Sequence, residues 1–191
     1  MDFARYLPLS AAPARDETDI GAEAHAAVAL AEAARLATGL PQERELVRAF
    51  ARDARITPDV DSAAALAAHA AAGTPGSRPP RIRELCSIVR ALLVLEEASG
   101  GQADLPDEMW GRVALYAATR TDFARRAALR GHTIAASDAS WSFGRGSVLR
   151  APQRDIVRFV LALSEIPPRA AVHEGVQAPP DSAPTSPETS M

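Results

Sequence analysis

The chain has 191 residues and a formal net charge of −3, a size that fits one domain with a terminal extension. All 21 basic residues are arginine, so chemistry that needs a lysine amine is excluded. The single cysteine, Cys86, excludes an intramolecular disulfide, and apolar neighbours at helical spacing predict that its thiol is buried. No apolar run is long enough to span a membrane and the N-terminus lacks a signal-peptide pattern, so we expect a cytoplasmic protein.

The first part of the chain predicts three alanine-rich helices. The first ends at Gly39, the second begins at Pro41, and the third runs from a cap at Thr57 to Gly73. The inward stripe of the second helix is predicted to be Leu46, Val47 and Phe50. Proline and glycine in residues 73–80 then predict a loop that is a candidate hinge.

Three stronger helices are predicted at residues 81–101, 106–131 and 152–166. Their predicted inward side chains include Leu85, Ile88, Val89, Leu92 and Leu95, then Met109, Val113, Tyr116 and Phe123, then Ile156, Phe159, Val160 and Leu163. Residues 167–191 are rich in proline, serine and threonine and have almost no large apolar side chains, which predicts a disordered tail.

Together these elements predict a mostly α fold. We expect a bundle of five or six helices with a short β-hairpin-like insert before the last helix and a disordered C-terminal tail. Residues 1–166 would form a single helical domain, with the candidate hinge at 73–80, and residues 167–191 would form the tail.

The insert is predicted from "RGHTIAASDASWSFGRGSVLRAP", the one stretch without a plain helical pattern. Its segments "TIAAS", "WSF" and "SVL" favour strands, with Gly144 and Gly146 at a turn between them. Trp141 and Phe143 would then fill the space that alanine-rich helices leave. Pro152 would begin the last helix.

A helix-turn-helix is a second interpretation of part of the same stretch. In "FARRAALRGHTIAASD", Ala124 would allow close packing, Leu129 would lie at the turn, and Ile134 would lie on the second helix. The exposed face of that second helix offers only small side chains, which do not read base edges. The hairpin is therefore the favoured interpretation.

The two parts of the chain have opposite charge. Residues 1–111 hold 11 Arg and 17 acidic residues, whereas residues 112–169 hold 10 Arg and 4 acidic residues. The basic part is either a footprint for an anion or a nucleic acid, or a face that docks on the acidic first part. The candidate partner- or anion-binding residues are Arg125, Arg126, Arg130, Trp141, Phe143 and Arg145.

Residues 131–163 also carry a short combination of motifs: an Ala-x-Asp-x-x-Trp run from Ala136 to Trp141, a Gly-x-Gly turn at 144–146 and an apolar helix that starts at Pro152. In these motifs the segment resembles the closing part of short proteins of the mycothiol-dependent maleylpyruvate isomerase family, which belong to the DinB-like helical bundles. The resemblance covers about 33 of the 191 residues and implies two or three short strands, followed by a helix, on a bundle.

The resemblance does not extend to the metal site of that family, which is built from histidines on the bundle helices after an early Gly-Trp. No Gly-Trp precedes a histidine here, and His25, His69, His132 and His173 are all isolated in the sequence. A bundle could still bring His25 and His69 together. We predict no catalytic residue, no metal and no cofactor.

From these observations we expect a non-catalytic cytoplasmic accessory or regulatory protein that acts by protein–protein contact, without a membrane partner. One alternative is a DinB-like metal-dependent thiol transferase or isomerase, or an inactive relative of one. A second alternative is a DNA-binding transcriptional regulator that uses the basic segment 120–158.

Overall fold

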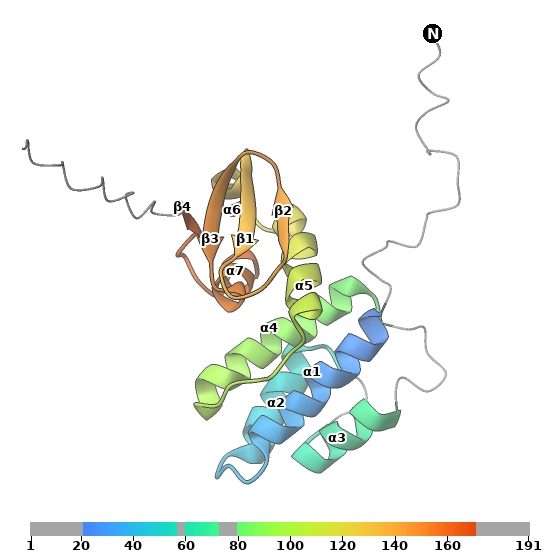
Figure 1. Ribbon diagram of the computed structural model, residues 1–191. Coiled ribbons are helices and arrows are strands. Elements are labelled where there is room, and N and C mark those ends of the chain that lie inside the picture. The colour runs from blue at the N-terminus through green and yellow to red at the C-terminus, as the bar shows by residue number, and fades with distance from the viewer. Residues whose placement is uncertain (1–20, 57–59, 73–79, 171–191) are drawn as a thin grey trace, which may run out of the picture.

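The computed structural model describes residues 21–56, 60–72 and 80–170, and these form seven helices and one four-stranded sheet (Figure 1). The helices are α1 (Ala22–Ala37), α2 (Glu43–Asp53), α3 (Ala63–Ala72), α4 (Ile82–Ser99), α5 (Asp107–Arg120), α6 (Phe123–Leu129) and α7 (Gln153–Val160). The strands are β1 (His132–Ala136), β2 (Ser142–Gly144), β3 (Ser147–Ala151) and β4 (Arg169–Ala170). The structure confirms a mostly α fold with a β insert before the last helix.

Two predictions fall largely outside the described residues. The candidate hinge at 73–80 is described only at residue 80, and the predicted tail at 167–191 only up to residue 170. Within that short overlap, residues 169–170 form β4, which pairs with β3, so the ordered sheet extends past the predicted start of the tail.

The helices α1 to α4 form one layer of the molecule, with α1 packed against α3 and α4 (Figure 1). Six alanines of α1 are buried, and their small side chains allow the neighbouring helices to approach closely. Helix α3 begins later than the predicted Thr57 cap, because the Ser62 hydroxyl accepts a hydrogen bond from the Ala65 N–H at 3.2 Å. Residue 57 lies outside the described residues.

Helix α4 contacts α1, α2 and α5 and supplies much of the core. Its predicted inward side chains are all buried: Leu85, Ile88, Val89, Leu92 and Leu95. Cys86 is buried beside them, as the sequence predicts.

The predicted helix 106–131 is wrong in one respect, because it is two helices with a break at Thr121 and Asp122. The Asp122 carboxylate accepts a hydrogen bond from the Arg125 N–H at 3.0 Å and so caps a new helix, α6. The break turns Phe123 out to solvent, where it is 79% exposed, although the helical stripe predicts it to be buried.

In the sheet, β1 lies between an antiparallel β2 and a parallel β3, in the order β2-β1-β3-β4. The insert therefore differs from a hairpin in which "WSF" and "SVL" pair with each other. Residues 144–146 instead carry the chain across the start of β1. A Cβ at Gly144 would overlap the His132 carbonyl oxygen and a Cβ at Gly146 would overlap that of Gly131, so both positions require glycine.

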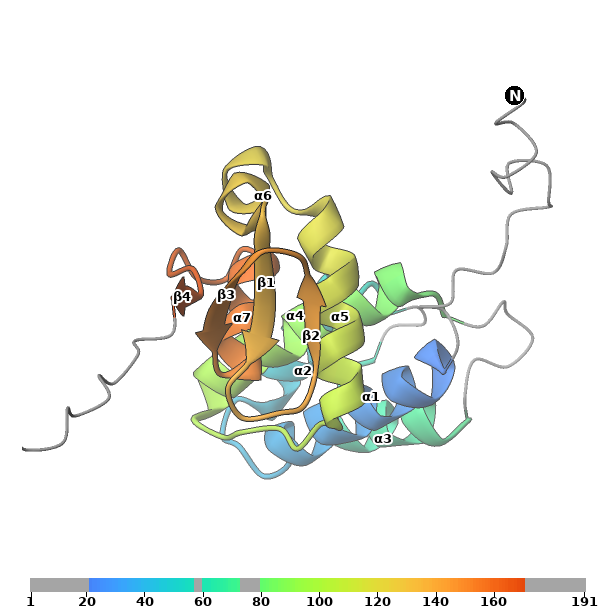
Figure 2. The same ribbon diagram turned by 45° about the horizontal axis from the view of Figure 1, so that its top comes forward.

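The inner face of the sheet packs on the helices. Phe143, Ile134 and Leu149 lie opposite one another across the strands, and Ile134 is only 1% exposed. Figure 2 shows α7 behind β1 and β3, with α5 running beside β2. The helix-turn-helix interpretation is thereby corrected, because its second helix is the central strand of this sheet.

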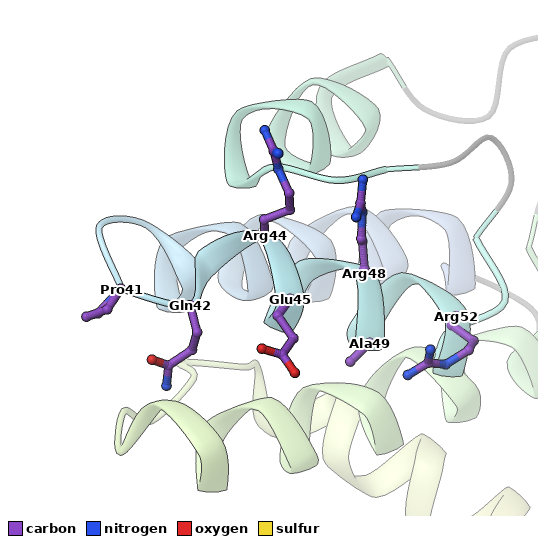
Figure 3. A pocket seen from close by; sticks show the side chains of 7 residues that line it. All are labelled: Pro41, Gln42, Arg44, Glu45, Arg48, Ala49 and Arg52. Atoms are coloured by element: carbon purple, nitrogen blue, oxygen red, sulfur yellow. The ribbon is translucent and has the colours of Figure 1, made fainter.

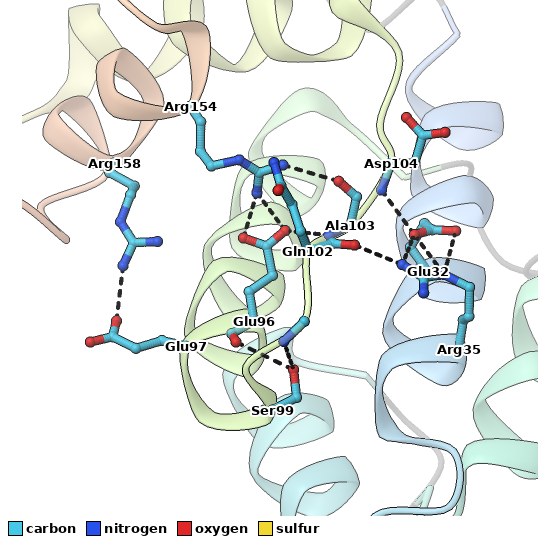
Figure 4. A network of polar contacts seen from close by, with 11 residues as sticks. Glu32, Arg35, Glu96, Glu97, Ser99, Gln102, Ala103, Asp104, Arg154 and Arg158 are labelled. Carbon is cyan, nitrogen blue, oxygen red and sulfur yellow. Dashed lines mark hydrogen bonds and ion pairs between the residues drawn. The ribbon is translucent and has the colours of Figure 1, made fainter.

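A polar network joins the layers (Figure 4). Arg154 of α7 binds the buried carboxylate of Glu96 on α4, and Arg158 pairs with Glu97 at 2.9 Å. Glu96 also accepts a hydrogen bond from the Ala103 N–H at 2.7 Å. Two arginines of the basic part thus dock on the acidic first part. Among the described helices, none is long and apolar enough to cross a membrane.

Candidate partner-binding site

An open groove of about 440 Å³ runs between helix α5 and the edge strand β2. We call it the β2 groove, and the residues that line it are Glu108, Gly111, Arg112, Leu115, Trp141, Ser142 and Phe143. Leu115 is 42% exposed and lines the groove together with two aromatic side chains, so the groove offers apolar surface to solvent. The groove brings Trp141 and Phe143, both candidates from the sequence, to one place.

Trp141 is held in the groove from three sides. Its indole lies on Gly111, where a Cβ would be only 3.0 Å from the indole Cγ. Its Nε1 donates a hydrogen bond to Gln153 Oε1 at 3.1 Å, and the Gln153 side chain in turn donates to Asp107 at 2.8 Å. The ring also stacks on Phe143, with ring centroids 6.1 Å apart. A fixed aromatic side chain of this kind can bind a partner without losing rotamer entropy.

The backbone of Ser142 faces the groove. In the antiparallel pair, the Ala136 N–H donates to the Trp141 carbonyl at 3.2 Å. The backbone N–H and C=O groups of Trp141 and Phe143 therefore point toward β1. Because hydrogen-bonding direction alternates along a strand, the N–H and C=O of Ser142 point to the free edge. β2 is an outer strand of the sheet, so within the described part of the chain no other strand pairs with these two groups.

Glu108 and Arg112 form a charged rim of the groove. Arg112 binds Glu108 at 2.6 Å, and this contact lowers the pKa of the Glu108 carboxyl. Burial lowers the pKa of His25 on α1. This side chain also lies close enough to Glu108 and Arg112 for their charges to act on its pKa. Its Nδ1 is buried and has no hydrogen-bond partner in the described part of the chain. Burial therefore favours the uncharged form of His25 beside the rim.

The structure separates the four candidate arginines. Arg125 belongs to the fold: it binds Asp122 and Glu165, lies 5.8 Å over the Phe159 ring, and its side chain is only 12% exposed. This corrects the expectation that Arg125 is free to bind a partner or an anion.

The other three candidate arginines remain on the surface. Arg126, Arg130 and Arg145 are exposed and make no ion pair with any described residue. None of them lines the β2 groove, so the sequence candidates fall into two separate surfaces.

The metal-binding question concerns His25 and His69. His25 lies beside Glu108 and Arg112, and His69 lies on α3. Within residues 21–56, 60–72 and 80–170, no group of three His, Cys, Asp or Glu side chains is arranged to hold a metal ion. Burial raises the pKa of the Cys86 thiol to about 12, so this cysteine is not a thiolate at neutral pH.

A second hollow, of about 600 Å³, lies along α2 and the turn before it (Figure 3). Its lining residues come from this one segment, and three of them are arginines, Arg44, Arg48 and Arg52. Arg44 and Arg48 both lie near Asp61, at 3.8 Å and 3.4 Å. Because one helix face supplies the whole lining, this hollow lacks the convergence of separate elements that marks the β2 groove.

Sequence reasoning missed the α5 side of the groove. Leu115, Glu108 and Gly111 belong to an amphipathic helix whose pattern predicts only which face is buried. A glycine inside a helix, as at Gly111, was the one signal that another group approaches closely.

Comparison of the chain with protein-family models, with curated proteins and with solved structures found no match. The resemblance of residues 131–163 to the maleylpyruvate isomerase family therefore stays a prediction. The assignment of function rests on the surfaces of the molecule.

Proposed function

We propose that this protein is a non-catalytic accessory or regulatory protein that acts by protein–protein contact, and that the β2 groove is its contact surface. The observation that carries the proposal is the fixed Trp141–Phe143 stack beside the exposed Leu115. Aromatic side chains held in a pocket and surrounded by a polar rim are typical of the few residues that dominate binding energy at protein interfaces.

The groove suits an extended segment of a partner protein. Such a segment can pair its main chain with the free N–H and C=O of Ser142, as in peptide recognition by strand addition. An apolar side chain of the segment would then lie against Leu115 and Phe143, because alternate side chains of a strand point to the same face. The Glu108–Arg112 pair forms the charged rim of the groove.

The test is affinity capture with the full chain and two variants, Leu115→Asp and Val94→Asp. Val94 lies on α4 and is 39% exposed, so it matches the 42% exposure of Leu115 but lies outside the groove. A charge at position 115 leaves an unpaired carboxylate in the contact, whereas a charge at position 94 faces water.

We expect a partner that the unchanged chain and Val94→Asp retain equally, and that Leu115→Asp loses by at least tenfold in quantitative mass spectrometry. The interaction is then repeated with the purified partner. Equal retention by both variants would exclude the β2 groove as the contact surface, and so would the absence of any retained partner. Circular dichroism of both variants separates lost binding from lost folding.

A further inference from the structure

The basic part of the chain contains a set of arginines that have no ion-pair partner among the described residues. Four of its ten arginines make ion pairs within the fold, namely Arg112, Arg125, Arg154 and Arg158. Arg120 lies 5.3 Å from the centre of the Tyr116 ring. The remaining five make no ion pair with a described residue and are exposed: Arg126, Arg130, Arg145, Arg150 and Arg169. We call these five the arginine surface.

One half of this surface lies on the outer face of the sheet. Arg150 of β3 is directly opposite Arg169 of β4, and the neighbouring Leu149 points to the inner face. Two like charges directly opposite on paired strands destabilise a sheet. A bound anion would remove that repulsion, because a guanidinium binds phosphate or carboxylate oxygens in a bidentate manner.

The other half lies where β1 and β3 begin. Gly146 is in backbone contact with Gly131, which brings the adjacent residues Arg145 and Arg130 to the same end of the sheet. Arg126 lies on α6, and Arg130 is the residue that follows the end of this helix. The two halves lie toward opposite ends of β3, whose five residues, at a rise of about 3.3 Å per residue, span about 13 Å.

The surroundings of the arginines favour a nucleic-acid backbone over an acidic protein segment. Between the two halves, the outer face of the sheet presents the paired residues Thr133 and Val148, whereas Ala135 is buried. These side chains form no apolar pocket of the kind that anchors a protein partner. A contact made almost only of positive charge is instead typical of binding to phosphates.

The same face favours a duplex over a single strand. Unpaired bases bind by stacking on aromatic side chains, and Trp141 and Phe143 lie in the β2 groove rather than between the arginines. Two arginine clusters at opposite ends of a strand about 13 Å long can reach phosphates on both sides of a major groove, which is about 12 Å wide.

We propose that the arginine surface binds the phosphate backbone of double-stranded DNA without reading its sequence. The face of a four-stranded sheet is too broad for a major groove, which admits a helix or a two-stranded ribbon, so the affinity comes from phosphate contacts. This surface is separate from the β2 groove, and the proposal does not depend on the proposed function.

The test measures fluorescence anisotropy of two unrelated 20-base-pair DNA duplexes between 50 and 200 mM salt. The full chain is compared with the double variants Arg150→Gln/Arg169→Gln and Arg44→Gln/Arg52→Gln. The second pair lies on α2, where both side chains are about three-quarters exposed, and it removes the same charge away from the sheet.

We expect equal affinity for both duplexes and a slope of log K against log salt of about −4 to −5, since each phosphate contact contributes about −0.9. The sheet variant should lower affinity at 50 mM salt at least tenfold and reduce the slope by about 2, while the α2 variant should leave the slope unchanged. Leu115→Asp should bind DNA normally.

Three outcomes would overturn the proposal. One is the absence of duplex binding at 50 mM salt, and another is an equal loss of affinity in both double variants. The third is preferential binding of a decaglutamate peptide that depends on Arg150 and Arg169, which would assign the arginine surface to an acidic protein partner. Circular dichroism confirms that the variants are folded.

Discussion

The indole of Trp141 lies directly on Gly111 of α5, with 3.0 Å between the indole Cγ and the position that a Cβ of residue 111 would occupy. This contact joins the edge strand of the sheet to the helix that forms the other wall of the β2 groove. The absence of a side chain at position 111 therefore sets the width of the groove.

Replacement of Gly111 by valine should displace Trp141 and break its hydrogen bond to Gln153. We expect a loss of about 1–3 kcal/mol in the free energy of unfolding, as for other overpacked sites, measured by urea denaturation. The matched change Ala67→Val, at an exposed position of α3, should cost only a few tenths of a kcal/mol. A Gly111→Val protein as stable as the original would show that Trp141 is not fixed by this contact.

The neighbouring residues Glu96 and Glu97 should differ sharply in their contribution to stability. Glu96 is 6% exposed and accepts hydrogen bonds from Arg154 and from the Ala103 N–H, so Glu96→Ala leaves the half-buried Arg154 without its counter-charge and the buried Ala103 N–H without its acceptor. We expect a loss of about 3–5 kcal/mol. Glu97 pairs with Arg158 at the surface, and Glu97→Ala should cost less than about 1 kcal/mol.

Urea denaturation of both glutamate variants checks this contrast. Similar losses for the two would mean that Arg154 finds another counter-charge when Glu96 is removed. The double variant Glu96→Leu/Arg154→Met should regain the part of the loss that comes from the unpaired charge, while the Ala103 N–H still lacks its acceptor.

The segment that crosses the start of β1 should need glycine at position 146 for two reasons. One is the positive φ of this residue, and the other is its close approach to Gly131. Gly146 has a φ of 119° and touches Gly131, whereas Gly39 has a φ of 76° and open space around its Cβ position. Gly39→Ala should therefore cost only the strain of a positive φ, about 1–2 kcal/mol. Gly146→Ala adds a clash with backbone and should cost more than 3 kcal/mol or prevent folding of the sheet.

Thermal unfolding followed by circular dichroism measures both glycine variants. If Gly146→Ala unfolds within a few degrees of Gly39→Ala, the close approach to Gly131 is not needed for the crossing.

The stability of the protein should fall at high pH because of Cys86. Burial raises the pKa of its thiol from 9.0 to about 12, so above pH 9 the unfolded chain releases a proton that the folded chain keeps. This contribution is fully present below pH 9 and is lost as the pH rises toward 12, by about 1.4 kcal/mol per pH unit.

The control for this pH dependence is Cys86→Ala, which should lack that part of the slope while keeping the part due to tyrosine and arginine. In addition, the thiol of the folded protein should react with a disulfide reagent at pH 8 only after denaturant is added. Rapid reaction without denaturant would contradict the burial of Cys86.

Much of the helical layer could be predicted from the sequence alone. The stripe from Leu85 to Leu95 predicts α4 and its buried face, and the β-favouring segments predict a β insert before α7. These predictions succeed because helical periodicity is a property of neighbouring residues, which bury the same face wherever the helix is placed. The break at Asp122 was not predicted because the apolar stripe continues at helical spacing past this residue. Asp122 itself is a good helix cap, and in the structure it begins a new helix.

The two surfaces, in contrast, were decided by the tertiary structure. The groove exists because β2 pairs with β1 at the edge beside α5, and strand order depends on partners distant in sequence. The same holds for the arginines: Arg125 and Arg126 are adjacent in sequence, yet one is bound to Asp122 and Glu165 while the other faces water. Composition determines how many arginines the chain carries. Only packing decides which of them meet an acid, because a charge is neutralised by what lies within a few ångströms in space.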